Sequence, residues 1–412
     1  MSDGSAAAAL PQENPLATSR TDARVSAASD RNRGLDALRG VSILFVVIHH
    51  VAIRIPLGKT ALAAFLPVWF LNGLSYNGGE SVVIFFVVSG FLITRRSLQR
   101  WGNLGDIPLR DFYLFRASRI VPTLLLVVAL LSLLHLIGMP YYVIDKPNQS
   151  LGGAIASALG LYLNWYEGQT GYLPGGWDVI WSLSVEEVFY LAFPLVCLTL
   201  GRVRWMFVAV LIALVLSMPF VRDALAAQRN EIWFEKAYLP GMSAIALGVL
   251  AAMLAARMKR PASWLAPLLC LLGIAGLCAI FFAGSGVWKL LHRGYEMLLI
   301  GSAASLVLGL HWQAKSKRPW QLRGLGWLCS CGRLSYEIYL FHMFCVFAIV
   351  SIAKQAGFGL EWGWLWYPPA LALSWLLGLA IARSFSQPCE RWLRSRWGRV
   401  RLWNCRRPAA ER

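Results

Sequence analysis

Long apolar runs separated by short polar segments fill most of the chain. A membrane-spanning helix needs about 20 mostly apolar residues, and ten runs predict such helices, at about 38–55, 80–94, 117–139, 179–200, 205–221, 237–256, 264–284, 294–311, 334–353 and 364–384. A further stretch, 151–165, is short and rich in Gly, and it predicts either an eleventh crossing or a half-membrane, re-entrant segment. The pattern therefore predicts an all-α, polytopic transmembrane helix bundle of about ten spans.

Composition agrees with a membrane protein. Of the 412 residues, 57% are hydrophobic and only 15% are charged, a balance that a soluble domain with a polar surface does not reach. Spans of about 20 residues with short connections use almost the whole length, so we expect no large water-soluble catalytic domain. Any chemistry is therefore expected among the helices.

The positions of Lys and Arg predict the orientation of the spans. The formal net charge is +18, and with ten spans and a cytoplasmic N-terminus most of the 39 Lys and Arg residues fall on the cytoplasmic side. A full span at 151–165 would invert the later loops and place the basic C-terminal end outside. The sequence therefore predicts a multi-pass protein of the plasma (bacterial inner) membrane with both termini in the cytoplasm. Topology and contact with membrane lipids explain the positive charge, and no nucleic-acid partner is needed.

The two ends of the chain differ from the predicted bundle. Residues 1–33 are rich in Ala, Ser, Asp and Arg and have no apolar h-region, which predicts a disordered cytoplasmic tail rather than a signal peptide. The membrane domain is predicted at 34–390, and 391–412 is predicted to be a basic cytoplasmic tail. The eight cysteines lack the spacing of a zinc site or of a disulfide framework, with Cys329 and Cys331 as the one close pair, so we expect no metal.

Ionisable residues inside spans mark candidate sites, because each costs about 2.5–3.5 kcal/mol on insertion scales. His50 follows Arg39 by eleven residues, or about 16 Å along a helix, and Glu186 follows Trp177 by nine, or about 13 Å from the opposite face. The imidazole is thus expected at the depth of Glu186 or Glu187, and which glutamate faces it is left open. The alternative is that these groups only hydrogen-bond helices to one another.

A cationic cluster is predicted at the cytoplasmic ends of the second and third spans. Arg116 and Arg119, at i and i+3, present two guanidinium groups on one side of a helix, which suits a phosphate ligand. Arg95 and Arg39 extend this candidate site, and Asp36 is placed to pair with Arg39. The alternative is that these arginines only flank the cytoplasmic ends of the spans, as Lys and Arg commonly do in membrane proteins.

Five segments, taken in chain order, resemble the integral-membrane acyltransferase family 3. Members of that family transfer acyl groups, commonly acetyl, to sugar hydroxyls of surface polysaccharides and related acceptors. The segments are 34–40 with His50, 85–93, Arg116 with Arg119, 181–191 and 334–342. The likeness extends over about residues 34–390, which are accordingly predicted to be a transmembrane acyltransferase domain.

The resemblance implies a ten-helix fold, a cytosolic acyl-CoA donor and essential roles for Arg39 and His50. Val83 stands where many members carry an acidic residue, so no role is assigned to nearby Glu80. Acyl-CoA is then a substrate, and no bound cofactor is expected. The candidate donor- and substrate-binding residues are Arg39, Arg95, Arg116, Arg119, Ser335, Tyr336 and His342.

The sequence therefore predicts a membrane O-acyltransferase. The acyl group, acetyl being expected, moves from acyl-CoA to a hydroxyl of a sugar or lipid-linked glycan, such as a polysaccharide or lipopolysaccharide. His50 acts as general base, and Glu186 or Glu187 fixes its tautomer. A proton-coupled transporter or flippase is the main alternative, because buried His and Glu also form proton relays. A scaffold role is also left open, as is a covalent acyl-enzyme on a serine of these segments, namely Ser89, Ser182 or Ser335.

Overall fold

The computed structural model describes residues 32–405 except 260, 322 and 358, and it describes 398–405 by backbone alone. The predicted disordered tail at 1–33 therefore lies almost entirely outside the described residues. Residues 406–412, the end of the predicted basic C-terminal tail, also lie outside the described residues.

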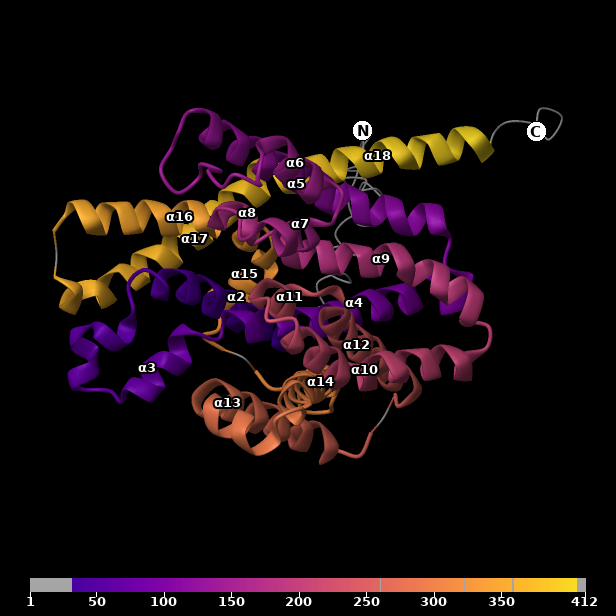
Figure 1. Cartoon of the computed structure of the whole chain (residues 1–412). Helices are drawn as coiled ribbons and strands as arrows, with labels where there is room; N and C mark the ends of the chain where they lie inside the picture. The colour runs from indigo at the N-terminus through magenta and orange to yellow at the C-terminus, as the bar shows by residue number, and fades with distance from the viewer. Residues whose placement is uncertain (1–31, 260, 322, 358, 406–412) are drawn as a thin grey trace, which may run out of the picture.

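Helices and their connections make up the described part of the chain, which contains no strand (Figure 1). The long helices are α2 (Arg33–Ala52), α4 (Gly78–Trp101), α5 (Leu109–Leu136), α9 (Trp181–Leu200), α10 (Arg204–Ala227), α12 (Tyr238–Arg257), α13 (Leu265–Leu291), α14 (Gly294–Ala314), α16 (Ser335–Gln355), α17 (Tyr367–Ile381) and α18 (Gln387–Cys405). The shorter α-helices are α3 (Val68–Ser75), α6 (Leu151–Leu159), α7 (Leu163–Thr170), α8 (Gly175–Asp178), α11 (Glu231–Lys236) and α15 (Gly326–Arg333). The 3₁₀ turns are η1 (Leu57–Lys59), η2 (Ala61–Ala64), η3 (Leu104–Asp106) and η4 (Leu360–Trp366), and the π-helical turn η5 (Ala382–Ser386) joins α17 to α18.

Ten segments of the described chain are long and apolar enough to cross a membrane, and they overlap the ten runs expected from the sequence. The prediction of a polytopic α-helical bundle is therefore confirmed. The stretch 151–165 forms no eleventh span, since it folds into α6, nine residues long, and the start of α7.

Helix α2 is held at its start and along its length. The side chain of Asn32 accepts a hydrogen bond from the Leu35 amide at 3.1 Å and donates to the Leu310 carbonyl at 3.1 Å, which caps the helix and ties it to α14. Gly40 lets α2 approach α15 so closely that a Cβ at this position would overlap the Leu328 carbonyl. This packing fixes the position of Arg39, the next residue back along the helix.

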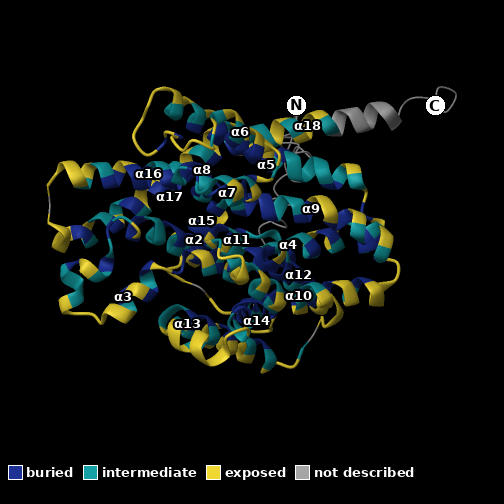
Figure 2. Ribbon diagram, viewed as in Figure 1, coloured by how far each residue is buried: buried dark blue, intermediate teal, exposed yellow. Residues whose placement is uncertain are grey.

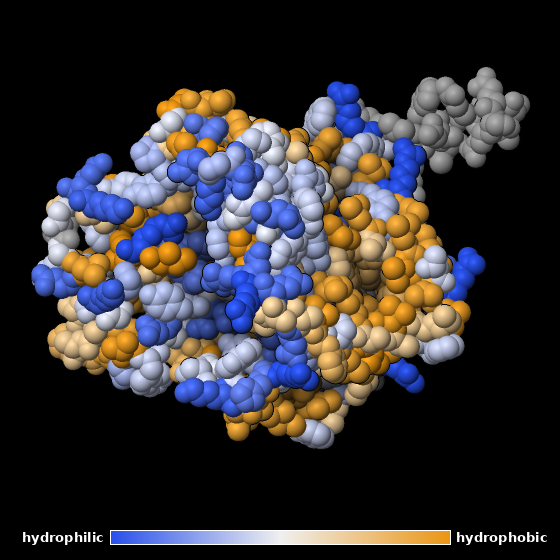
Figure 3. Space-filling model, in the orientation of Figure 1, coloured by the Kyte–Doolittle hydropathy of each residue, from blue (hydrophilic) through white to orange (hydrophobic). Residues whose placement is uncertain are grey.

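The bundle has a packed interior and an apolar outer surface. Buried residues follow the helix faces that meet in the middle of the bundle, and exposed residues lie at its periphery (Figure 2). Hydrophobic side chains cover the side of the molecule formed by α9 and α10, whereas hydrophilic residues gather near the middle of the face shown, where α7, α8 and α11 lie (Figure 3). An apolar periphery is what a bilayer requires, and the polar middle indicates where water and polar ligands reach the interior.

Candidate active site

Two cavities lie toward opposite ends of helix α2. The arginine cavity, of about 130 Å³, is lined by Arg39, and the histidine cavity, of about 910 Å³, is lined by His50. Continuous helix separates these two residues by about 16 Å along its axis. The polar residues around the arginine cavity are Arg39, Ser89, Arg96, Arg116, Arg119, Ser182, Glu186, Glu187, Tyr190, Ser335, Tyr336 and Tyr339.

Guanidinium groups give the arginine cavity an excess of positive charge, because four of them line it against two carboxylates. Arg39 is held by a hydrogen bond from its Nη2 to the hydroxyl of Ser335, at 2.7 Å. Arg119 makes no hydrogen bond or ion pair with another described residue, so its fork of donors is open to a ligand. Such a set of donors suits a phosphate or another multivalent anion.

Arg96 lines the arginine cavity, whereas Arg95, the residue expected there, does not. Adjacent residues of an α-helix point about 100° apart, and here the turn of α4 brings Arg96 to the cavity and Arg95 away from its lining. Which of the two arginines faces the cavity could not be predicted from their positions in the sequence.

The two glutamates of α9 belong to the arginine cavity. Glu187 Oε1 lies 2.8 Å from Arg116 Nη2, and Glu186 Oε1 lies 4.0 Å from the same nitrogen. Glu186 also accepts hydrogen bonds from the hydroxyls of Tyr190, at 2.6 Å, and of Ser89. The guanidinium of Arg116 stacks on the Tyr190 ring, 3.6 Å from its centroid. These contacts give the carboxylates the role of orienting the wall of the arginine cavity.

The expected pairing of His50 with Glu186 or Glu187 is not made, because no hydrogen bond joins His50 to either carboxylate among the described residues. The number of residues along each helix puts the imidazole and the carboxylates at one level along the membrane normal, but it does not determine where they lie around the bundle. Helix α9 turns both carboxylates toward α4 and α5 instead.

A second imidazole takes the place expected for the carboxylate. His342 Nε2 lies 3.3 Å from His50 Nδ1, and the ring centroids are 4.8 Å apart. The Val46 carbonyl oxygen lies 2.8 Å from His50 Nδ1, and that of Tyr339 lies 2.7 Å from His342 Nδ1. Since a carbonyl oxygen only accepts hydrogen bonds, both Nδ1 atoms carry their hydrogen. His342 Nε2 then accepts a hydrogen bond from His50 Nδ1. The lone pair on Nε2 of His50 stays free, and His50 lines the histidine cavity.

The two other candidates on α16 occupy different places. His342 is fully buried and lines neither cavity, so its contact is with His50 and not with a ligand. Tyr336 lines the arginine cavity and donates its hydroxyl hydrogen to the Ile120 carbonyl at 3.0 Å. Asp36 is buried in the first turn of α2 beside this region.

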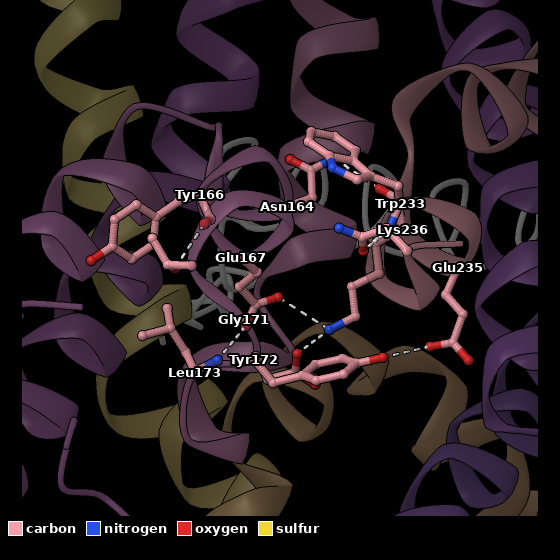
Figure 4. Close-up of polar contacts among 12 residues, drawn as sticks. Asn164, Tyr166, Glu167, Gly171, Tyr172, Leu173, Trp233, Glu235 and Lys236 are labelled. Atoms are coloured by element: carbon pink, nitrogen blue, oxygen red, sulfur yellow. Dashed lines mark hydrogen bonds and ion pairs between the residues drawn. The ribbon is translucent and has the colours of Figure 1, made fainter. Parts of the chain in front are cut away.

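A buried lysine anchors one wall of the histidine cavity (Figure 4). Lys236 Nζ lies 3.1 Å from Glu167 Oε2, pairs with Asp178, and sits 4.4 Å from the centroid of the Tyr172 ring. The Tyr172 hydroxyl in turn donates to Glu235 at 3.4 Å. Burial, reinforced by the nearby carboxylate of Asp178, raises the pKa of Glu167 well above its usual value although Lys236 opposes the shift.

This lysine wall was not expected from the sequence. Lys236 stands directly before an apolar run and Glu167 directly after the Gly-rich stretch, so the cost of burying charge could have marked both. Tyr172, Asp178, Glu235 and Lys236 all line the cavity. An aromatic face flanked by charged hydrogen-bonding groups suits a ligand rich in hydroxyls.

Val82, Phe86 and Tyr339 line both cavities and so form the partition between them. The Tyr339 hydroxyl accepts a hydrogen bond from Ser182 at 2.7 Å, and the Phe86 ring packs edge-on to Trp181 with centroids 6.1 Å apart. A group bound in the arginine cavity is therefore separated from the histidine cavity by these shared side chains.

The fold and the two cavities define a polytopic membrane protein whose cationic and imidazole-lined spaces approach each other inside one helix bundle. The chain belongs to acyltransferase family 3, because the sequence profile of that family, described as an acyltransferase domain, matches residues 32–383. The family description thus names acyl transfer as the activity of the domain that this chain matches.

The curated relatives are O-acetyltransferases by name. The O-acetyltransferase OatA of Staphylococcus aureus (strain NCTC 8325 / PS 47) is 23% identical over 329 residues, which cover 75% of this chain and 49% of that protein. A protein of Staphylococcus aureus (strain COL), provisionally named as an O-acetyltransferase, is 30% identical over 176 residues, which cover 40% of this chain and 25% of that protein. The chain thus spans about a quarter to a half of the length of these relatives. No solved structure matches it.

Proposed function

We propose that this enzyme transfers an acyl group, acetyl in the simplest case, from acyl-CoA to a hydroxyl of a sugar or lipid-linked glycan. The observation that carries the proposal is His50 at one cavity, with its Nδ1 held by the Val46 carbonyl and by His342, beside a second cavity with an excess of guanidinium groups. Family membership and the names of the relatives support transfer of an acyl group to oxygen. They favour this function over proton-coupled transport and over a scaffold role.

The acyl-CoA donor binds with its charged part toward the arginine cavity. Arg39, Arg96 and Arg119 provide donors for its phosphates, while Arg116 is held in place by Glu187. The distribution of Lys and Arg along the chain predicts that these arginines lie at the cytoplasmic ends of their spans. We therefore assign the donor to the cytoplasmic face of the plasma membrane and the histidine cavity to the opposite half of the bundle.

The chemical step uses His50 as general base. An acceptor hydroxyl gives its proton to His50 Nε2 while its oxygen attacks the thioester carbonyl carbon, which has passed the partition formed by Phe86 and Tyr339. The tetrahedral intermediate then loses the CoA thiolate as the C–S bond breaks, and the imidazolium returns the proton to that sulfur. His342 accepts a hydrogen bond from His50 Nδ1, which fixes the tautomer of His50, as was expected of a glutamate, and stabilises the imidazolium.

A sugar acceptor fits the lysine wall of the histidine cavity. The ring of Tyr172 offers a face on which a sugar can stack. The charged side chains of Asp178, Glu235 and Lys236 around this ring can bind sugar hydroxyls. The volume of about 910 Å³ is at the upper end of the roughly 300–1,000 Å³ usual for small-molecule sites.

Transfer of label from acetyl-CoA tests the proposal. Membranes that contain the protein should move labelled acetyl groups into their glycan or lipid fraction, and His50→Ala should lower the rate by about 10²–10⁴-fold. His135→Gln is the matched control, because His135 lies on α5, lines neither cavity and accepts a hydrogen bond from the Ile144 amide. Retained transfer by a stable His50→Ala protein would remove His50 from the mechanism, and no transfer by the wild type would argue against the donor.

A further inference from the structure

An aromatic side chain beside the arginine cavity is contacted by two arginines from different helices. The Arg100 guanidinium of α4 lies 3.6 Å from the centroid of the Phe115 ring of α5, and that of Arg394 on α18 lies 5.1 Å from it. Arg394 Nε also donates to the Ser118 hydroxyl at 3.4 Å. We call Arg100, Phe115 and Arg394 the Phe115 cluster.

The Phe115 cluster continues the line of cations that begins in the arginine cavity. On α4, Arg96 lines the cavity, and Arg100 follows one turn later, about 6 Å nearer the helix end. On α5, Phe115 directly precedes the cavity residue Arg116. The cluster therefore lies at the margin of the cavity, at the end of the bundle where α4 ends and α5 begins.

The C-terminal segment is fixed to this region at two points. Arg394 is paired with Glu390 at 2.5 Å, one turn earlier on α18, and it contacts α5 through Phe115. At the start of the segment, the Ser386 hydroxyl donates to the carboxylate of Glu337 at 2.8 Å, and both side chains are buried. Since Glu337 follows the cavity residue Tyr336, η5 and α18 together are tied to two helices of the arginine cavity, α16 and α5.

The size of the arginine cavity requires a binding surface outside it. Its volume of about 130 Å³ is below the roughly 300–1,000 Å³ of pockets that enclose drug-sized ligands, so it cannot enclose a nucleotide together with a thioester arm. Arg100 and Arg394 are exposed, and guanidinium groups beside an aromatic ring bind phosphates and stack on nucleobases.

We propose that the Phe115 cluster binds the nucleotide end of the acyl donor, with Arg100 and Arg394 on its phosphates and Phe115 beside the base. This assignment rests on the proposed use of acyl-CoA. It makes α18 part of the donor site, with the phosphates farthest from the thioester at the Phe115 cluster. The phosphates nearer the thioester arm are left to Arg39, Arg96 and Arg119 of the arginine cavity. The shared chemistry is phosphate recognition, which an anionic lipid headgroup could also satisfy.

Two donors that differ only in the nucleotide test the assignment. Full-length protein in phosphatidylcholine nanodiscs is assayed with acetyl-CoA and with acetyl-pantetheine, which lacks the nucleotide and its phosphates. Arg394→Gln and Arg100→Gln should each raise the KM for acetyl-CoA by about tenfold, the effect of one charge-assisted hydrogen bond. Neither should change the KM for acetyl-pantetheine. Arg396→Gln is the control, since Arg396 lies on the same helix and contacts Trp392 instead.

Three results would overturn the assignment, and each is distinct. Equal rises of KM for both donors would show that the cluster only supports the packing of α18, and thermal unfolding of each variant would register that loss. An effect that appears in phosphatidylglycerol nanodiscs and not in phosphatidylcholine would assign the arginines to lipid headgroups. A wild-type protein that uses neither donor would contradict the proposed function itself, and this assignment with it.

Discussion

Replacing the two imidazoles one at a time separates their roles. His50→Ala removes the free lone pair, and general-base catalysis contributes about 10²–10⁴-fold, equivalent to about 2.7–5.4 kcal/mol of the barrier. His342→Leu removes one hydrogen bond of 3.3 Å to His50 Nδ1, worth about 0.5–1.5 kcal/mol, or about 2- to 12-fold in rate. The Val46 carbonyl, 2.8 Å from the same nitrogen, still holds the tautomer in that variant.

The assay is the initial rate of label transfer from acetyl-CoA at saturating donor, with thermal unfolding as the test of folding. His342→Gln provides the matched control, because its amide oxygen can still accept the hydrogen bond from His50. We expect rates in the order wild type, His342→Gln, His342→Leu and, far below, His50→Ala. If folded His342→Leu lost as much activity as His50→Ala, His342 would take part directly and the tautomer argument would be wrong.

Four further predictions concern the donor, the lysine wall and helix packing. Arg119→Gln should raise the KM for acetyl-CoA about tenfold or more at nearly constant kcat, since its guanidinium has no protein partner among the described residues; an unchanged KM in steady-state kinetics would exclude it from the donor site. Lys236→Met should destabilise the fold by about 3–5 kcal/mol, because it removes the buried cation that contacts Asp178 and Glu167. The pKa of Glu167 is raised in the folded protein, so its contribution to stability is largest below the usual glutamate pKa and is lost as pH rises through the raised pKa. The Tm should therefore fall as pH rises between these two pKa values. Glu167→Gln should make the Tm less dependent on pH. Gly248→Val should cost about 1–3 kcal/mol, because a Cβ there meets the Val87 carbonyl across the α4–α12 contact, and an unchanged Tm would refute that packing.

The spans could be predicted from sequence because each depends only on a continuous run of apolar residues. The ten runs match the ten candidate spans of the described chain, and the short length of 151–165 correctly indicated that this stretch differs from them. The spacing of Arg116 and Arg119 also carried geometric information, because residues at i and i+3 share a helix face and both line the arginine cavity.

The partner of His50 could not be predicted, because sequence gives depth along a helix but not the neighbour on the next helix. From the sequence, His342 is only a candidate binding residue, and Glu186 or Glu187 is the expected partner of His50 because a carboxylate commonly pairs with a catalytic imidazole. The lysine wall was missed for a related reason. Its charges come from α7, α8 and α11, short helices whose packing no hydropathy pattern describes.

Sealed membrane vesicles of the two orientations give the most direct test of an acyl group moving from one half of the bundle to a histidine in the other. Acyl-CoA added outside should label the glycan or lipid fraction of inside-out vesicles, in which the arginine cavity faces the added donor, and His50→Ala should abolish that labelling. Right-side-out vesicles should stay unlabelled until they are made permeable. Equal labelling of both intact orientations, or labelling that survives His50→Ala, would contradict the account.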